Sequence, residues 1–545
     1  MNHLYLIVIL AGFSFNLFAF EIQGNPKSWV KEDFIGFDEI GDAKSGIGDI
    51  SSVFSFIEGD NLFLRITFDD MYSREYNIDY FRDEDININL LISSSGEELF
   101  NNTFNLNKRL VQKDIFHFLR TPHFNLFELG IDWPNSDTIK DLFFNIKIIH
   151  NNKIVDEFTS DSSGEHRGGN AAFVHHGNQG LTYSEVFYGQ EPQENSGFDE
   201  ILEVHQETGI PGNFHLSGTL MPAAEWHNPE FNDWLESGVI DGYVSMLTSA
   251  LGQHMMPFVH NDMNNWSVAI ESDMVEYRYG YTPRVAWVPE RVWLSPGTYP
   301  DAGVIDWLGD NWEQHGVEAV ILDDYIHCPG ADNKKIHWMN NDEGINLRVI
   351  PIDNDFVGMM HYDADAAKNH ISSTGQYGIT VYGTDWEVAA EMNEHNETSF
   401  LDNYENIMWY CYDNFPAVNI WKLDAALYNS DFNGSRIDVQ NGTYGLLGGT
   451  DGYGGGNNSW YTNWAETISH SDYHDPQWNY GTVWNDAYSN LMSAPNNSLA
   501  QLGWYTLMIN LHETGWHTDG EVADWEHRYS SHIKNANVYA DAARW

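Results

Sequence analysis

Two segments carry acids directly after short apolar runs, which is where a buried strand would present a side chain for chemistry. Residues 287–293 read Trp-Val-Pro-Glu-Arg-Val-Trp, so Glu290 follows the apolar run 285–288. Further along, the run 378–382 leads into Gly-Thr-Asp-Trp-Glu, which contains Asp385 and Glu387. Sugar hydrolysis by paired carboxylates needs one group that acts on the anomeric carbon and another that protonates the leaving oxygen. We therefore expect Glu290 and Asp385 to form such a pair.

A structural role is the alternative for Glu290, because Arg284 and Arg291 are close enough in sequence to pair with it and pin a strand end. The aromatic neighbours favour the chemical role. Flat indole faces for pyranose rings flank both acids, at Trp287, Trp293 and Trp386.

The elements that must position these acids alternate between strand-like and helix-like runs. Helix-length stretches such as 197–208, 305–315 and 364–373 separate seven apolar runs, which are 171–174, 213–216, 242–246, 285–288, 319–322, 347–350 and 379–382. Seven repeats of strand then helix predict an α/β fold, a parallel (β/α)7 barrel over residues 170–425, with its chemistry at the carboxyl ends of the strands. Residues 418–423 are either an eighth strand or part of a helical cap. His254 after the third strand and Asp324 after the fifth face the same rim, where each either binds a sugar hydroxyl or completes a hydrogen-bond network.

Residues 170–425 resemble glycoside hydrolase family 57. Glu290 before Arg-x-Trp is similar to the family's nucleophile motif, and Asp385-x-Glu387 is similar to the motif whose Asp is the general acid/base. The resemblance implies that the barrel is an incomplete (β/α)7 barrel. It also implies a retaining enzyme that cleaves α-glucosidic linkages in α-glucans and uses no cofactor or catalytic metal.

Three further segments extend the resemblance. His175-His176-Gly177 stands where the family usually has His-Gln-Pro, and the strand 212–218 carries a polar His. Residues 511–517 look like a Glu-Thr-x-Trp-His segment at which C-terminal helices close over the sugar. The resemblance thus implies substrate contacts from His176, His215, Arg291, Glu387, Glu513 and Trp516.

Outside the barrel, the chain is expected to hold three more regions. The apolar stretch 4–19 predicts a signal peptide (residues 1–19) and a secreted or periplasmic protein, with an uncleaved anchor as the alternative because Leu17 suits a cleavage site poorly. Short β-branched and aromatic runs predict a β-sandwich-like domain over 20–163, including a hairpin that turns at Asn151-Asn152, and a polar, Gly-rich linker follows at 161–169. Residues 426–545 are expected to be a loop-rich and helical cap, with a buried helix at 499–512; its Gly-rich stretch 445–464 is either a loop over the rim or a structural loop.

Composition restricts the partners. With 80 acidic and 26 basic residues the formal net charge is -54, spread along the chain, which argues against nucleic acid and anionic membranes. Such an excess favours solubility, and some of the carboxylates could bind structural calcium. Cys328 and Cys411 form either one disulfide or two buried thiols.

Two other functions are weighed against the glycosidase. Residues 67–70 (Thr-Phe-Asp-Asp) and 470–474 (His-Ser-Asp-Tyr-His) resemble metal motifs of polysaccharide deacetylases, but they lie some 400 residues apart instead of within one small barrel. A noncatalytic glycan-binding protein is the third alternative, against which the intact acid pair argues.

Overall fold

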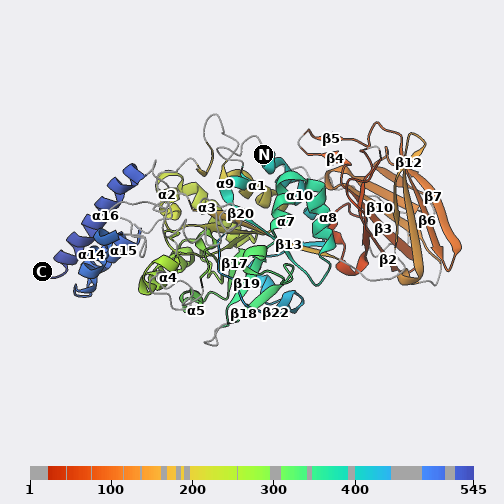
Figure 1. Ribbon diagram of the computed structural model, residues 1–545. Coiled ribbons are helices and arrows are strands. Elements are labelled where there is room, and N and C mark those ends of the chain that lie inside the picture. The colour runs from red at the N-terminus through yellow and green to blue at the C-terminus, as the bar shows by residue number, and fades with distance from the viewer. Residues whose placement is uncertain are drawn as a thin grey trace. The chain divides into compact units, whose positions relative to one another are not determined.

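The computed structural model describes residues 22–44, 46–74, 76–113, 116–134, 138–160, 168–178, 186–189, 197–254, 256–294, 308–340, 346–390, 399–443, 481–509 and 522–545. The chain divides into two compact units, one formed by Met1–His166 with Asp413–Pro416 and the other by Arg167–Tyr412 with Ala417–Trp545 (Figure 1). The predicted signal peptide and most of the predicted linker lie outside the described residues. Among the helices that are described, none is both long and apolar enough to cross a membrane.

The first unit contains two antiparallel sheets. The larger sheet has the order β1 (Phe34–Phe37), β2 (Ile50–Glu58), β3 (Asn61–Phe68), β10 (Leu126–Asp132), β9 (Phe116–Thr121) and β8 (Leu110–Gln112). The smaller sheet has the order β12 (Lys153–Thr159), β11 (Leu142–His150), β6 (Ile86–Ser94) and β7 (Glu97–Asn105). A short pair, β4 (Tyr72–Ser73) and β5 (Ile78–Asp79), stands apart.

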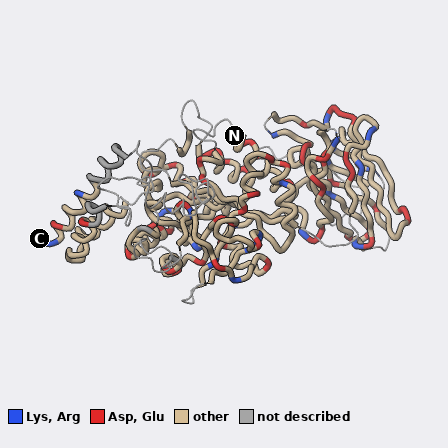
Figure 2. Tube along the Cα trace, viewed as in Figure 1, with Lys and Arg blue, Asp and Glu red and all other residues tan. Residues whose placement is uncertain are grey.

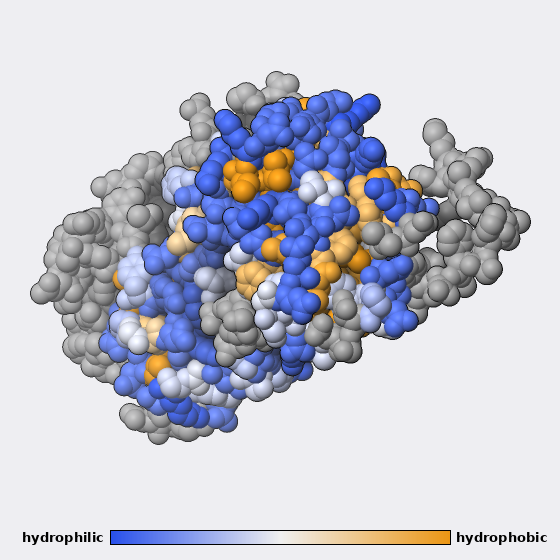
Figure 3. Space-filling view, turned by 90° about the vertical axis from the view of Figure 1, so that its right-hand side faces the viewer, coloured by the Kyte–Doolittle hydropathy of each residue, from blue (hydrophilic) through white to orange (hydrophobic). Residues whose placement is uncertain are grey.

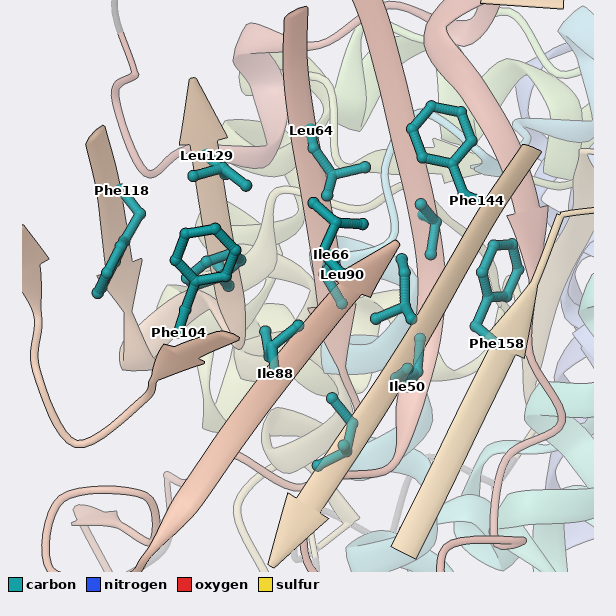
Figure 4. Close-up of a cluster of buried hydrophobic side chains, with 14 of the residues drawn as sticks. Ile50, Leu64, Ile66, Ile88, Leu90, Phe104, Phe118, Leu129, Phe144 and Phe158 are labelled. Carbon is teal, nitrogen blue, oxygen red and sulfur yellow. The ribbon is translucent and has the colours of Figure 1, made fainter. Parts of the chain in front are cut away.

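Alternating side chains explain why these sheets pack face to face. Along β6 every second residue is buried, from Ile86 to Ile92, because successive side chains of a strand point to opposite faces. Burying each such side chain contributes about 1.5–3 kcal/mol. Figure 4 shows side chains of both sheets meeting in one apolar layer. The predicted hairpin is confirmed: β11 and β12 pair across Asn151 and Asn152, whose φ angles of 50° and 62° suit a tight hairpin turn.

The second unit is built on parallel strands. β15 (Val244–Met246), β14 (Gly212–Leu216), β13 (Gly169–Gly177) and β20 (Thr380–Asp385) pair in that order, and β21 (Val418–Ile420) also pairs with β13. A second sheet has the order β16 (Val285–Trp287), β17 (Ala319–Asp323), β19 (Arg348–Ile352), β18 (Ile336–Met339) and β22 (Asn433–Ile437). Each of the seven predicted strand runs overlaps an observed strand, and residues 418–420 form a short strand as well.

Backbone hydrogen bonds link the two sheets of this unit at both ends. The Trp287 N–H donates to the carbonyl of Thr248, just after β15, at 2.9 Å. At the other end, the Asp353 N–H after β19 donates to the carbonyl of Val381 in β20 at 3.0 Å. The seven parallel strands are therefore neighbours in the series β13, β14, β15, β16, β17, β19 and β20.

Helices form most of the connections between these strands. Further helices form the described part of the C-terminal region. The described helices of this unit are α1 (Phe198–Thr208), α2 (Leu220–His227), α3 (Pro229–Asp241), α4 (Asn261–Tyr279), α5 (Leu308–Glu313), α6 (Asp324–His327), α7 (Asn354–Tyr362), α8 (Ala364–Ser373), α9 (Trp386–Ala389), α10 (Phe400–Asp413), α11 (Leu423–Ala426), α14 (Gly481–Met492), α15 (Ser498–Ile509) and α16 (Val522–Ala542). Local signals set several ends: Gly209 ends α1 at φ 68°, and the Asp363 carboxylate caps the start of α8. The helix predicted at 499–512 is observed as α15, but one of its faces is exposed, including Leu502 and Tyr505.

Surface charge and thiols complete the description. Acidic residues are scattered over the described parts of both units (Figure 2). The face drawn in Figure 3 is mostly hydrophilic, with some hydrophobic patches among the hydrophilic residues. Cys328 and Cys411 are both buried and free, so the chain contains two thiols and no disulfide between them.

Candidate active site

Glu290 lies in a tight turn, three residues after the end of β16. The short 3-10 turn Pro289–Arg291 starts with Pro, whose fixed φ favours a turn, and it then enters the left-handed region, with φ 48° at Glu290 and φ 50° at Arg291. Each left-handed non-glycine residue costs about 1 kcal/mol or more. The Thr443 hydroxyl donates to the Glu290 carbonyl at 2.6 Å and helps to hold this conformation. Strained backbone held by its surroundings is typical of a functional site.

Arg291 connects this turn to the next strand. Its side chain is 10% exposed, and its Nε lies 3.5 Å from Oδ2 of Asp323, the last residue of β17. The guanidinium carbon also lies 5.0 Å from the centre of the Trp287 ring. Arg284 instead pairs with Glu318. Both arginines that are close to Glu290 in sequence thus lie against a carboxylate of another residue.

Asp385 is the last residue of β20 and precedes α9. In the parallel pairing of β20 with β13 it lies opposite His176. Its neighbour Glu387 is half-buried in α9. The register therefore places Asp385 beside the segment that resembles the first motif of the family.

His176 connects the two acid-bearing strand ends. Its ring stacks on Trp287, with centroids 4.6 Å apart and planes 13° apart, and its Nδ1 lies 2.8 Å from Nδ1 of His215. Burial, then the neighbouring His215 and Arg291, hold the pKa of His176 well below its ordinary value, so the imidazole is neutral. Its Nε2 is buried and has no hydrogen-bond partner among the described residues. Because Nδ1 is already hydrogen-bonded to His215, Nε2 is the nitrogen of this ring that could bond to a ligand.

Glu271 completes the network and escaped the sequence-based prediction. It lies on α4, is fully buried, and its Oε1 is 2.6 Å from Nε2 of His215. A signal for it exists in the sequence, since Ser267, Glu271 and Val275 form one stripe of a helix at four-residue spacing and all three are buried. An acid on the buried stripe of a helix needs a partner, and His215 supplies it.

The hydrogen bonds favour one arrangement of protons on the two histidines. His215 donates from Nε2 to the Glu271 carboxylate, so its Nδ1 accepts from Nδ1 of the neutral His176. Nε2 of His176 is then a hydrogen-bond acceptor.

The structure corrects the expectation that tryptophans offer open faces to a pyranose. Trp293 and Trp386 are fully buried, and Trp287 is 1% exposed. Trp386 stacks on Phe198 at 4.4 Å, because the short α9 turns this ring into the apolar core. These rings are part of the buried packing of the second unit.

His254 and Asp324 both lie in hydrogen-bond networks, the second of the two roles expected for them. His254 is fully buried, its Nε2 is 2.8 Å from Oδ1 of Asn264, and burial lowers its pKa to about 4. Asp324 accepts from the side-chain amides of Asn354 and Asn333, each at 2.9 Å. Contacts with a sugar hydroxyl remain a prediction for these residues.

Several predicted residues lie outside the described part of the chain. They are Glu513, Trp516, His470 and His474, together with residues 445–464 of the Gly-rich stretch. Residues 67–70, the other half of the deacetylase-like pattern, lie at the end of β3 in the first unit, where Asp70 accepts N–H groups of Gly48 and Asp49. Among the described residues, the group of acids whose carboxylate oxygens are close enough together to bind one metal ion also lies in the first unit. It is distant in sequence from Glu290 and Asp385.

Comparison with known proteins places this chain in a family. The profile of glycosyl hydrolase family 57 matches residues 106–405, more than half of the chain. The chain is 26% identical over 159 residues to a 4-alpha-glucanotransferase of Thermococcus litoralis, which is 29% of this chain and 22% of that protein. It is 25% identical over 159 residues to an alpha-amylase of Pyrococcus abyssi, again 29% of this chain and 22% of that protein. The matched segments thus span less than a quarter of these curated relatives.

The fold agrees with this assignment. The crystal structure of the Thermococcus litoralis 4-alpha-glucanotransferase superposes with a TM-score of 0.51 at 16% identity, covering 68% of this chain and 60% of that one. The profile match over more than half of its length shows that the chain belongs to glycosyl hydrolase family 57.

Proposed function

We propose that this chain is a retaining glycoside hydrolase that cleaves α-glucosidic linkages in α-glucans, with Glu290 as nucleophile and Asp385 as general acid/base. Family membership supports the reaction class, and the names of the two relatives support α-glucans as substrates. The observation that carries the residue assignment is the position of His176. It lies opposite Asp385 in the pairing of β13 with β20, and it stacks on Trp287 three residues before Glu290.

The seven parallel strands support an incomplete (β/α)7 barrel around this site. The contact between His176 and Trp287 joins β13 to β16, which are separated by β14 and β15 in the strand series. Rings on strands that are not neighbours touch only when the sheet curves enough to bring their ends together. A curved, closed sheet would therefore direct Glu290 and Asp385 towards a common space at the carboxyl ends of the strands.

The reaction proceeds in two displacements at one anomeric carbon. The Glu290 carboxylate attacks this carbon while Asp385 protonates the departing glycosidic oxygen, which gives a covalent glycosyl-enzyme. Asp385, now a carboxylate, removes a proton from water, and the resulting attack releases the sugar with its original configuration. This mechanism requires carboxyl groups about 5–5.5 Å apart, whereas an inverting enzyme needs about 6.5–9.5 Å.

Polar residues around the pair orient the sugar in this proposal. The neutral His176 accepts a hydroxyl hydrogen at Nε2, and Arg291, held by Asp323, keeps positive charge next to the nucleophile turn. Glu513 and Trp516 are proposed to approach from the C-terminal region, following the family resemblance. We also propose export to the periplasm or the medium, on the basis of the apolar stretch 4–19.

Digestion of a substrate panel tests this function. The full chain is incubated with α-glucans and α-galactosides, and the products are separated by chromatography, with the anomer formed first followed by NMR. We expect shorter α-glucans released with the α configuration, and loss of this activity in Glu290→Gln. Activity on α-galactosides alone would refute the substrate class, and a β product would refute retention. Release of acetate from an acetylated glycan, without cleavage of the chain, would refute the reaction class.

A further inference from the structure

A cluster of aspartates lies at one end of the sandwich in the first unit. Asp38 and Asp42 follow β1, Asp49 immediately precedes β2, and Asp156 is part of β12. One carboxylate oxygen from each of Asp42, Asp49 and Asp156 lies within 4.8 Å of the others. Because β2 and β12 belong to different sheets, the cluster bridges the two layers of the sandwich.

Two of these carboxylates are almost completely removed from water. Asp49 and Asp156 are each 5% exposed. The Asp49 Oδ2 atom accepts from the Gly41 N–H at 2.7 Å, but its Oδ1 atom is buried without a hydrogen-bond partner, as is Oδ2 of Asp38. In the described part of the chain, none of the four aspartates forms an ion pair with Lys, Arg or His.

This arrangement is unfavourable without a cation. Burial, followed by repulsion from Asp156 and Asp42, raises the pKa of Asp38 to about 8. Burial is also the main cause that raises the pKa of Asp49 to about 7 and that of Asp156 to about 6. Buried carboxylates this close together are normally paired with a cation or coordinate a metal, because desolvation penalises the charged form.

We propose that Asp42, Asp49 and Asp156, with Asp38 beside them, bind a calcium ion that joins the two sheets of the sandwich. Calcium prefers six to eight oxygen ligands at about 2.3–2.6 Å, so two oxygens on one ion are separated by at most about 5 Å. The observed bound of 4.8 Å fits this geometry. Backbone carbonyls and water can supply the remaining ligands, as in other calcium sites.

The surrounding hydrogen bonds preform the site. The Asp70 carboxylate accepts the N–H groups of Gly48 and Asp49, at 2.9 and 3.1 Å, and so orients the loop that carries Asp49. Asp156 accepts the Ile50 N–H at 2.7 Å, which already links β12 to the start of β2. Bound calcium would strengthen this link, so its effect should be on the stability of the first unit and not on the acids of the second. The inference is therefore independent of the proposed function.

The test uses the full chain after treatment with a chelator. Calcium chloride is titrated in by calorimetry, magnesium chloride serves as a parallel probe, and thermal unfolding is followed with and without calcium. Three variants are compared: Asp49→Asn, Asp42→Asn at an exposed ligand, and Asp83→Asn as an exposed control in the same unit. Asn keeps the size of the side chain and removes charge, so Asp49→Asn should fold without calcium.

We expect wild type and Asp83→Asn to bind calcium and to unfold several degrees higher when it is present. Asp49→Asn and Asp42→Asn should bind at least about tenfold more weakly, because each loses a charged ligand, and the rise in Tm should shrink with them. Absence of binding in wild type, unchanged binding in both cluster variants, or tighter binding of magnesium than of calcium would each overturn the proposal.

Discussion

The imidazole of His176 stacks on the indole of Trp287, although the two residues lie on strands that are separated by two others. This contact joins β13, which pairs with the strand that ends at Asp385, to β16, which precedes the turn that contains Glu290. A buried aromatic contact therefore links the two regions that carry the proposed acid pair. The activity should depend on the residues that make and support this contact as well as on the two acids.

The two acids should be separable by role. Glu290→Gln should block the glycosyl-enzyme with every substrate, because no leaving group replaces a missing nucleophile. Asp385→Asn should still glycosylate Glu290 when the leaving group is activated, and the intermediate should then persist for want of a base. Mass spectrometry of the intact protein would detect it.

Azide supplies the control for this assignment. Because it needs no base, it should restore turnover of Asp385→Ala on an α-linked activated substrate and yield the α-configured glycosyl azide. The reverse result would contradict the assigned roles: Glu290→Gln would be active on activated substrates, and Asp385→Asn would be inactive on all substrates.

The left-handed backbone conformation at Glu290 should lower the stability of the folded protein. Glu290→Gly should unfold at a higher temperature than Glu290→Ala, by about 1 kcal/mol in stability, because glycine adopts φ 48° without the Cβ penalty. Both variants should be inactive. At exposed Glu203 in α1 the order should be opposite, since glycine destabilises a helix relative to alanine. Equal melting temperatures for the Glu290 pair would show that the turn stores no strain.

Glu271 should act as a positioning residue through His215 and His176. Glu271→Gln removes the charge that accepts from His215, and we expect kcat/KM to fall about tenfold or more, equivalent to about 1.4 kcal/mol. The exposed Glu276→Gln on the same helix is the matched control. In a His176→Asn background, Glu271→Gln should have little further effect on kcat/KM, whereas additive losses would indicate a purely structural role.

Buried His254 should make stability depend on pH. Its pKa is lowered to about 4 in the folded protein, so the unfolded state binds the proton first as pH falls below about 6.5. The stabilisation is complete above that pH and is lost towards pH 4, on the order of 3 kcal/mol. Wild type should therefore lose more Tm than His254→Gln between pH 7 and 5. Exposed His227→Gln should follow wild type, and identical profiles for all three proteins would contradict the prediction.

Chelation should leave the chemical step intact. If carboxylates alone perform it, EDTA should not change kcat when the assay is run below the melting temperature of the calcium-free protein. A metal-dependent deacetylase would instead lose activity and regain it with a divalent ion. Initial rates with EDTA, and after a divalent ion is restored, distinguish these cases.

The sequence by itself indicated the seven parallel strands of the second unit, part of the sandwich of the first unit, and the positions of the two acids at or after the ends of their strands. Hydrophobic periodicity is a local property, so runs such as 285–288 and 379–382 indicated strands and placed Glu290 and Asp385 at their ends. Asn151-Asn152 likewise indicated a hairpin, because the conformations that a tight turn requires depend on two residues.

Only the tertiary structure decided which side chains meet. Glu271 and His215 are 56 residues apart, and Asp49 and Asp156 come from different sheets, so no local pattern brings either pair together. The tryptophans show the same limit: Trp386 follows an acid in sequence, but whether its ring faces solvent or core depends on the helix that follows, which turns it onto Phe198. Side-chain contacts across a fold depend on the curvature of sheets and the packing of distant elements, and these are set by the whole chain.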